Sequence, residues 1–165
     1  MGTDKAKEEF EKTKALAEKG NRVAQFRLGM AYHKGAGVPK NDKEAVNWWR
    51  KAAVQGFATA QYNLGNLYGY GIGAPKDDKE AVKWYRKAAL QEHVWAQTKL
   101  GFMYADGEGV PQDYVTAYAW YNIAAANGYT GAATRKGNAA KQLTSAQIIQ
   151  AQALSQTLSR QIRTP

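Results

Sequence analysis

The sequence predicts an all-α chain that is built from stacked helix–turn–helix repeats. Three consecutive segments of 36 residues, 24–59, 60–95 and 96–131, share one register, and the first two are identical at 20 of 36 positions without a gap. Within each segment, apolar residues recur with the spacing of two amphipathic helices, and a glycine- and proline-containing loop separates them. A fixed period between about 20 and 50 residues is typical of repeat folds, in which each unit buries its apolar face on its neighbours.

The segment 4–23 precedes the first full repeat and is expected to form one helix. Shifted by one period, Leu16 and Ala17 fall on the positions of two alanines of the second helix, and Gly20 falls on the glycine that follows it. The segment therefore corresponds to the second half of a repeat whose first half is missing. We expect it to cap the N-terminal end of the stack.

The first helix of each repeat is predicted from an apolar stripe with helical spacing. In the first copy the stripe consists of Ala24, Leu28, Ala31 and Tyr32, at i, i+4, i+7 and i+8. Gly29 lies inside this helix, where glycine costs about 1 kcal/mol relative to alanine. All three copies keep glycine at this position, so we expect another helix to approach closely there.

The second helix of each repeat is predicted from its N-terminal capping residues. Asn41 is followed three residues later by Glu44, which is the pattern of a capping box, and Asp77 with Glu80 repeats it. In the third copy Asp113 keeps the cap, but threonine replaces the glutamate. These helices are therefore expected to start at the same position in every repeat.

The second helices carry paired aromatic residues, which we assign to the core because they recur at helical spacing in the same positions. The pairs are Trp48 and Trp49, Trp84 and Tyr85, and Trp120 and Tyr121. The basic residues beside them are expected to lie on a solvated outer face. They are Arg50, Lys51, Arg86 and Lys87.

The segment 132–165 is predicted to be a degenerate repeat followed by a capping helix. Thr144 and Gln147 form another capping box, which places a helix start at Thr144. The following helix has one apolar stripe, made of Ile148, Ala151, Leu154, Leu158 and Ile162.

The repeated columns resemble Sel1-like repeats, which are relatives of tetratricopeptide repeats. The pattern is A-x-x-x-L-G-x-x-Y-x-x-G-x-G-V-P, then D/N-x-x-x-A-x-x-W/Y, then A-A-x-x-G, and it covers 24–131 as complete units. The resemblance implies a right-handed α/α solenoid with helical caps that acts as an adaptor, binding other proteins or peptides without catalysis. One disulfide-rich branch of the family is disfavoured because this chain has no cysteine. The resemblance also favours a bacterial periplasmic or secreted location over a cytoplasmic one.

The resemblance further implies a concave groove that the first helices of the repeats line, and the positions that vary between copies are the candidates for partner recognition. Phe26 and Tyr62 are also candidates for packing between neighbouring repeats, His33 and Tyr70 for plain surface, and the Met30 column for either role. The predicted groove residues are Phe26, Met30, His33, Tyr62, Asn66, Tyr70, Trp95, Thr98, Phe102 and Asp106.

The charge distribution supports an alternative function. The net charge is +9, and residues 132–165 contain no acidic residue. Such a surface is suited to a polyanion, either nucleic acid or an anionic envelope component. No nucleic-acid-binding motif accompanies the charge, so a nucleic-acid partner is not favoured. The basic residues that carry this alternative are Lys136, Lys141, Arg160 and Arg163.

Catalysis and cofactor binding are not predicted. His33 and His93 lie far apart in the sequence, and there is no cysteine to complete a metal site. No convergent set of titratable residues suggests an enzyme, so we expect no catalytic residue, no metal and no cofactor. No apolar run reaches the roughly 18 residues of a membrane helix, and Met1–Gly20 lacks the apolar region of a signal peptide.

Overall fold

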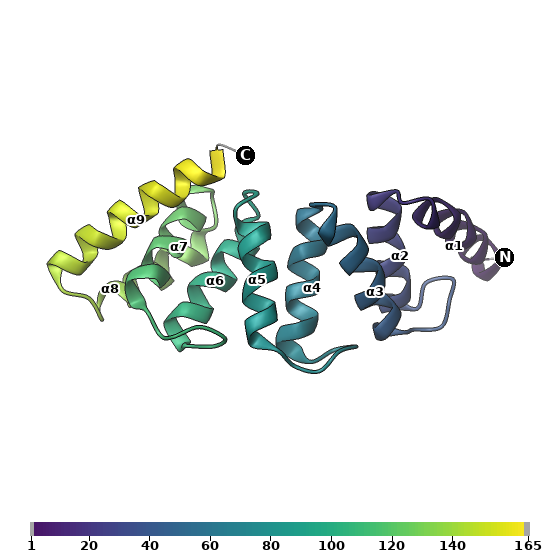
Figure 1. Cartoon of the computed structure of the whole chain (residues 1–165), viewed down its shortest axis with the longest axis horizontal. Coiled ribbons are helices and arrows are strands. Elements are labelled where there is room, and N and C mark those ends of the chain that lie inside the picture. The colour runs from purple at the N-terminus through teal and green to yellow at the C-terminus, as the bar shows by residue number, and fades with distance from the viewer. Residues whose placement is uncertain (1, 164–165) are drawn as a thin grey trace. The chain divides into compact units, whose positions relative to one another are not determined.

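A computed structural model describes the backbone of residues 2–163 and the side chains of residues 4–162. This part of the chain contains nine α-helices and no strand, which confirms the predicted all-α class (Figure 1). The helices group into two compact units, Met1–Asp77 with α1 to α4 and Asp78–Pro165 with α5 to α9. The bounds are α1 Gly2–Glu18, α2 Arg22–Lys34, α3 Asp42–Val54, α4 Ala58–Tyr70, α5 Asp78–Ala89, α6 Val94–Asp106, α7 Tyr114–Ala126, α8 Thr130–Ala140 and α9 Ser145–Arg163.

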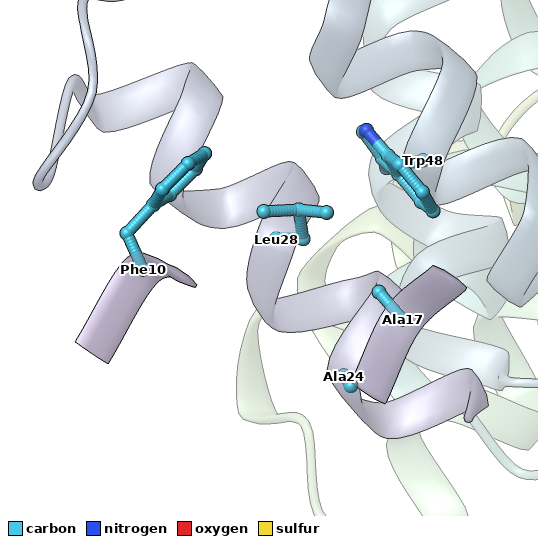
Figure 2. Close-up of a cluster of buried hydrophobic side chains, with 5 residues drawn as sticks. All are labelled: Phe10, Ala17, Ala24, Leu28 and Trp48. Carbon is cyan, nitrogen blue, oxygen red and sulfur yellow. The ribbon is translucent and has the colours of Figure 1, made fainter. Parts of the chain in front are cut away.

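In the N-terminal unit, each helix packs against the next helix along the chain, from α1 through α4. Figure 2 shows the buried cluster that joins the first three of them: Phe10 and Ala17 come from α1, Ala24 and Leu28 from α2, and Trp48 from α3. Leu28 is completely buried. The segment before the first repeat thus packs its own apolar residues on that repeat.

In the C-terminal unit, α7 is the helix on which the end of the chain packs. It contacts α6 and α8, its neighbours in sequence, and also the terminal helix α9. Tyr118 and Tyr121 of α7 form a buried cluster with Ala139 of α8 and Ala151 of α9. The first two residues of the apolar stripe on the last helix, Ile148 and Ala151, therefore pack into this cluster.

The stripe on α9 differs from the predicted one at one position. Ser155, which the apolar pattern does not include, is buried, whereas Leu154 beside it is only half-buried. Asn122 of α7 explains this burial, because its Nδ2 donates a hydrogen bond of 2.8 Å to the hydroxyl of Ser155. Lys136 of α8 in turn donates to the Oδ1 of Asn122 at 3.2 Å.

The N-terminal caps at Asn41 and Asp113 form, but the capping box that pairs Asn41 with Glu44 is incomplete. Oδ1 of Asn41 accepts a hydrogen bond of 3.1 Å from the backbone N–H of Glu44. The backbone N–H of Asn41 donates to the carbonyl of Tyr32 at 2.8 Å, so this N–H is already satisfied and the glutamate does not return the bond. Thr144 and Gln147 do form a complete box, with bonds of 2.9 and 3.2 Å.

The paired aromatic residues of the second helices are buried, as predicted for the core. Their exposed fractions range from 1% for Trp120 to 8% for Trp48. The neighbouring basic residues are exposed, also as predicted, but they cover aromatic rings. The ammonium of Lys51 lies 3.9 Å from the ring centroid of Trp48, and Lys87 lies 4.6 Å from that of Trp84.

Candidate functional site

Two of the predicted groove residues line an apolar pocket in the N-terminal unit. Phe26 and Met30 lie on the same face of α2, four residues apart, and both are half-buried. Opposite them, α1 contributes Phe10 and Thr13, and the pocket has a volume of about 280 Å³. We call this the apolar pocket; its remaining lining residues are Ala6, Glu9, Arg27, Ala31, Lys34 and Ala36.

The repeat register shows which residue of a full repeat Thr13 replaces in the wall of the apolar pocket. Thr13 occupies the position that holds Trp49, Tyr85 or Tyr121 in the full repeats, one, two or three periods later. A threonine side chain is far smaller than these aromatic residues. Thr13 therefore takes up less of the space beside Met30 than an aromatic residue would.

The ring of Phe26 is held by aromatic contacts on its other sides. Its centroid lies 5.0 Å from that of Phe57 and 6.4 Å from that of Trp49. Nε1 of Trp49 also donates a hydrogen bond of 3.0 Å to the carbonyl of Phe26. One wall of the apolar pocket is therefore rigidly positioned by the second helix of the same repeat.

The rim of the apolar pocket is charged. Arg27 and Lys34 lie on α2, Glu9 lies on α1, and all three are exposed. In the described part of the chain, none of the three is within ion-pairing distance of an oppositely charged group. The rim thus has one more positive than negative charge.

The other predicted residues of the N-terminal unit have different surroundings. Nδ1 of His33 and Oδ1 of Asp42 are 2.6 Å apart, so this histidine links the end of α2 to the start of α3. Tyr62 and Asn66 are half-buried on α4, and Tyr70 at the end of that helix is 63% exposed.

In the C-terminal unit, two predicted residues lie near the start of α6. Trp95 is 54% exposed, and its ring centroid lies 4.9 Å from that of Tyr129. Thr98 is buried, and its hydroxyl donates a hydrogen bond of 3.0 Å to the carbonyl of Val94. Because Thr98 is buried and its hydroxyl already has an acceptor, it is not placed to contact a partner directly.

The remaining two predicted residues, Phe102 and Asp106, line a second pocket, which has a volume of about 250 Å³. Tyr121 of α7 and Arg135 of α8 complete its central part. We call this the arginine pocket. Its other lining residues are Ala105, Tyr114, Asn138, Ala139 and Gln142.

The aromatic rings position the charged residue of the arginine pocket. The guanidinium of Arg135 lies 3.8 Å from the ring centroid of Phe102, and the ring of Tyr121 meets Phe102 edge-on at 6.1 Å. Burial raises the pKa of Tyr121 to about 12; Arg135 works against this rise and Asp106 adds to it. The hydroxyl of Tyr121 is therefore a neutral hydrogen-bond donor at any physiological pH.

The other residue with a clearly shifted pKa, His93, has a structural contact. His93 caps α6 by accepting a hydrogen bond of 3.3 Å from the backbone N–H of Ala96, and burial lowers its pKa. Within residues 4–162, no group of three or more His, Asp or Glu side chains is arranged to hold a metal ion. No helix in the described part of the chain is long and apolar enough to cross a membrane.

The basic residues of the polyanion alternative lie on two helices and a loop. Lys136 on α8 donates to Asn122, Lys141 is exposed at the end of α8, and Arg160 is exposed on α9. The side chain of Arg163 lies outside the described residues.

The arginine pocket contains residues that the sequence analysis does not predict as site residues. Arg135 lies in the degenerate segment, and Tyr121 is predicted only as core. A signal for Arg135 does exist, because one period earlier its position holds Lys99, and three periods earlier it holds Arg27 at the rim of the apolar pocket. A basic residue therefore occupies this position of the first helix in three of the four copies, with Asn63 as the exception.

Several solved structures are similar to this chain. A Sel1 repeat protein from Oxalobacter formigenes is 39% identical, with a TM-score of 0.72 over 79% of this chain and 98% of that protein. A protective antigen of uropathogenic Escherichia coli strains, which displays an SLR fold, is 35% identical with a TM-score of 0.72; the match covers 93% of this chain and 41% of the antigen.

Cysteine-rich protein B of Helicobacter pylori shares the fold at 20% identity, with a TM-score of 0.63 over 78% of this chain and 95% of that protein. No protein of curated function matches the sequence significantly. The Sel1 repeat profile matches residues 22–57, 58–93 and 96–129, which is more than half of the chain. The repeating columns, the all-helical fold and these matches together show that the chain belongs to the Sel1 repeat family.

Proposed function

We propose that this protein is a non-catalytic adaptor that binds a peptide segment of a partner protein, with Phe26 and Met30 of the first repeat helix contributing to the main contact. The observation that carries the proposal is the apolar pocket. It combines an apolar interior, lined by Phe10, Phe26 and Met30, with a charged rim. A buried apolar anchor surrounded by polar groups is the usual arrangement of an energetically important contact in a protein interface.

The pocket chemistry suggests the kind of residue that the partner inserts. A volume of about 280 Å³ accommodates one large aliphatic or aromatic side chain. Arg27 and Lys34 favour a carboxylate next to that side chain, because they outnumber Glu9 on the rim. The partner segment is therefore proposed to present a large apolar residue with an acidic residue nearby.

The proposal is tested by selecting binding peptides from a random library and measuring their affinity for variants of the full chain. Met30→Glu places a charge in the apolar pocket, so we expect at least about a tenfold loss of affinity, as for a hot-spot residue. Val54→Glu is the matched control, since Val54 is 67% exposed and lies outside the pocket. Equal affinities of the two variants, with circular dichroism showing intact helices, would contradict the proposal.

A second candidate function is polyanion binding by the C-terminal segment. The observation that favours it is the absence of any acidic residue from 114 to 165. Retention on heparin that falls steeply with added salt and is reduced in Lys141→Gln would support it. Retention that is weak at low salt, or that Lys141→Gln and Arg160→Gln leave unchanged, would eliminate it.

A further inference from the structure

We infer that the arginine pocket binds the main chain of an extended peptide, with Arg135 and Tyr121 donating to a peptide carbonyl and Asp106 accepting from a peptide N–H. This inference rests on the proposed function and adds a second contact site to it. It concerns only the C-terminal unit, whereas the apolar pocket lies in the N-terminal unit. The two sites can therefore be tested separately.

The first donor is Arg135. Its guanidinium is stacked on Phe102 at 3.8 Å, which restricts its orientation. Among the described residues, no carboxylate lies within ion-pairing distance and no acceptor takes a hydrogen bond from it. A guanidinium has five N–H donors in a plane, and here they remain for a ligand.

The second donor is the hydroxyl of Tyr121. The ring is 3% exposed, packed against Phe102 and close beside Gly101, so the hydroxyl has a defined position in the pocket lining. It makes no hydrogen bond with another described residue. Because its pKa is about 12, the hydroxyl keeps its proton and donates rather than repelling a carbonyl oxygen.

The acceptor is Asp106, the last residue of α6. Its carboxylate is exposed and lines the same pocket, and within the described chain no Lys or Arg lies within 4.0 Å of it. Other polar groups nearby are already engaged: Gln112 donates to the carbonyl of Ala105 at 2.8 Å and to the hydroxyl of Tyr114 at 3.2 Å.

The charge balance of the pocket selects a dipolar ligand over an ion. Arg135 attracts a free carboxylate, but Asp106 repels it. A free cation is attracted by Asp106 and repelled by Arg135. A peptide group carries one acceptor and one donor without net charge, so it can satisfy both sides at once.

The test is a titration of the full chain with acetyl-tetraalanine amide. Nuclear magnetic resonance shifts of the backbone amides of the protein report the binding. This peptide has no charge and no large side chain, so it reports on main-chain recognition. We expect saturable shifts at Phe102, Asp106 and Arg135. The backbone N-methylated analogue lacks the N–H donors, so it should bind at least about tenfold more weakly, as for a lost hydrogen bond to a charged group.

The variants separate the two sides of the site. Arg135→Gln and Asp106→Asn should each weaken binding of the peptide by about tenfold or more. Asp106→Asn should not weaken the N-methylated analogue further, since that probe makes no bond to the carboxylate. Lys141→Gln and Glu108→Gln change the same charges at exposed positions outside the pocket and serve as controls.

Two results would overturn the inference. One is the absence of saturable shifts at these residues, and the other is stronger binding of acetate than of the uncharged peptide, which would make this a carboxylate site. Either result would leave the proposed function standing if Met30→Glu still weakens binding of the selected peptides by at least about tenfold. If Met30→Glu has no effect while the results at the arginine pocket are as expected, the proposed role of the apolar pocket is wrong and that of the arginine pocket is unaffected.

Discussion

The indole of Trp49 occupies the space beside Gly29, where a Cβ atom would lie 2.4 Å from its Cδ1. The expected close approach at this glycine is thus made by a side chain of α3. The same relationship recurs in the C-terminal unit, where a Cβ on Gly101 would lie 2.4 Å from Cε1 of Tyr121. In both units the same aromatic residue of the second helix also packs against a pocket residue: Trp49 contacts Phe26 of the apolar pocket, and Tyr121 contacts Phe102 of the arginine pocket.

Gly29→Ala is expected to destabilise the protein although alanine favours helices. The added methyl must displace a buried indole, and overpacking of this kind costs about 1–3 kcal/mol, which exceeds the gain of about 1 kcal/mol in helix propensity. Urea denaturation of the variant should show a lower free energy of unfolding. Gly137→Ala is the control: nothing lies within 4 Å of its Cβ position, so it should be neutral or stabilising. Destabilisation of equal size in both variants would contradict the packing argument.

Asn41→Ala should lower the free energy of unfolding by about 0.5–2 kcal/mol, because its side chain caps the backbone N–H of Glu44. Glu44→Ala should change it by less than about 0.5 kcal/mol, since the carboxylate does not return a hydrogen bond to the cap. Thermal unfolding of the two variants checks the difference. Equal losses would mean that the capping box is complete in solution.

Tyr121 should make stability decline at alkaline pH. Its folded pKa of about 12 is above the ordinary value of 10.0, so between these values the unfolded state releases the proton first. Stability is therefore unaffected by this group below pH 10 and falls as the pH rises toward about 12. In Tyr121→Phe, the decline in denaturant midpoint over this range should be smaller than in the native chain. An identical decline would show that Tyr121 titrates like an exposed tyrosine.

Thr13→Trp should fill the apolar pocket with a side chain of the kind that the full repeats carry at this position. Selected peptides should then bind at least about tenfold more weakly, because the added indole occupies the site of the partner's apolar residue. Burial of the indole should leave the melting temperature unchanged or raised. Ala15→Trp, at an exposed position of the same helix, is the matched control. Unchanged affinity in a folded Thr13→Trp variant would mean that peptides bind elsewhere.

Local periodicity determined much of this protein from the sequence alone. The all-α class, the helix starts at Asn41 and Thr144, and the burial of Trp48 and Tyr121 follow from spacing and capping chemistry, which act between residues close in the chain. Alignment by the repeat period also shows that Thr13 stands where the full repeats have an aromatic residue.

Only the tertiary structure decided which groups from different helices meet and how much space they leave. The stacking of Arg135 on Phe102, the pairing of His33 with Asp42 and the burial of Ser155 beside Asn122 each join residues of separate helices. A hydrophobic pattern states which face of a helix is buried, but it does not state which side chain lies opposite. That depends on the packing of whole side chains, and the volume left over becomes a pocket.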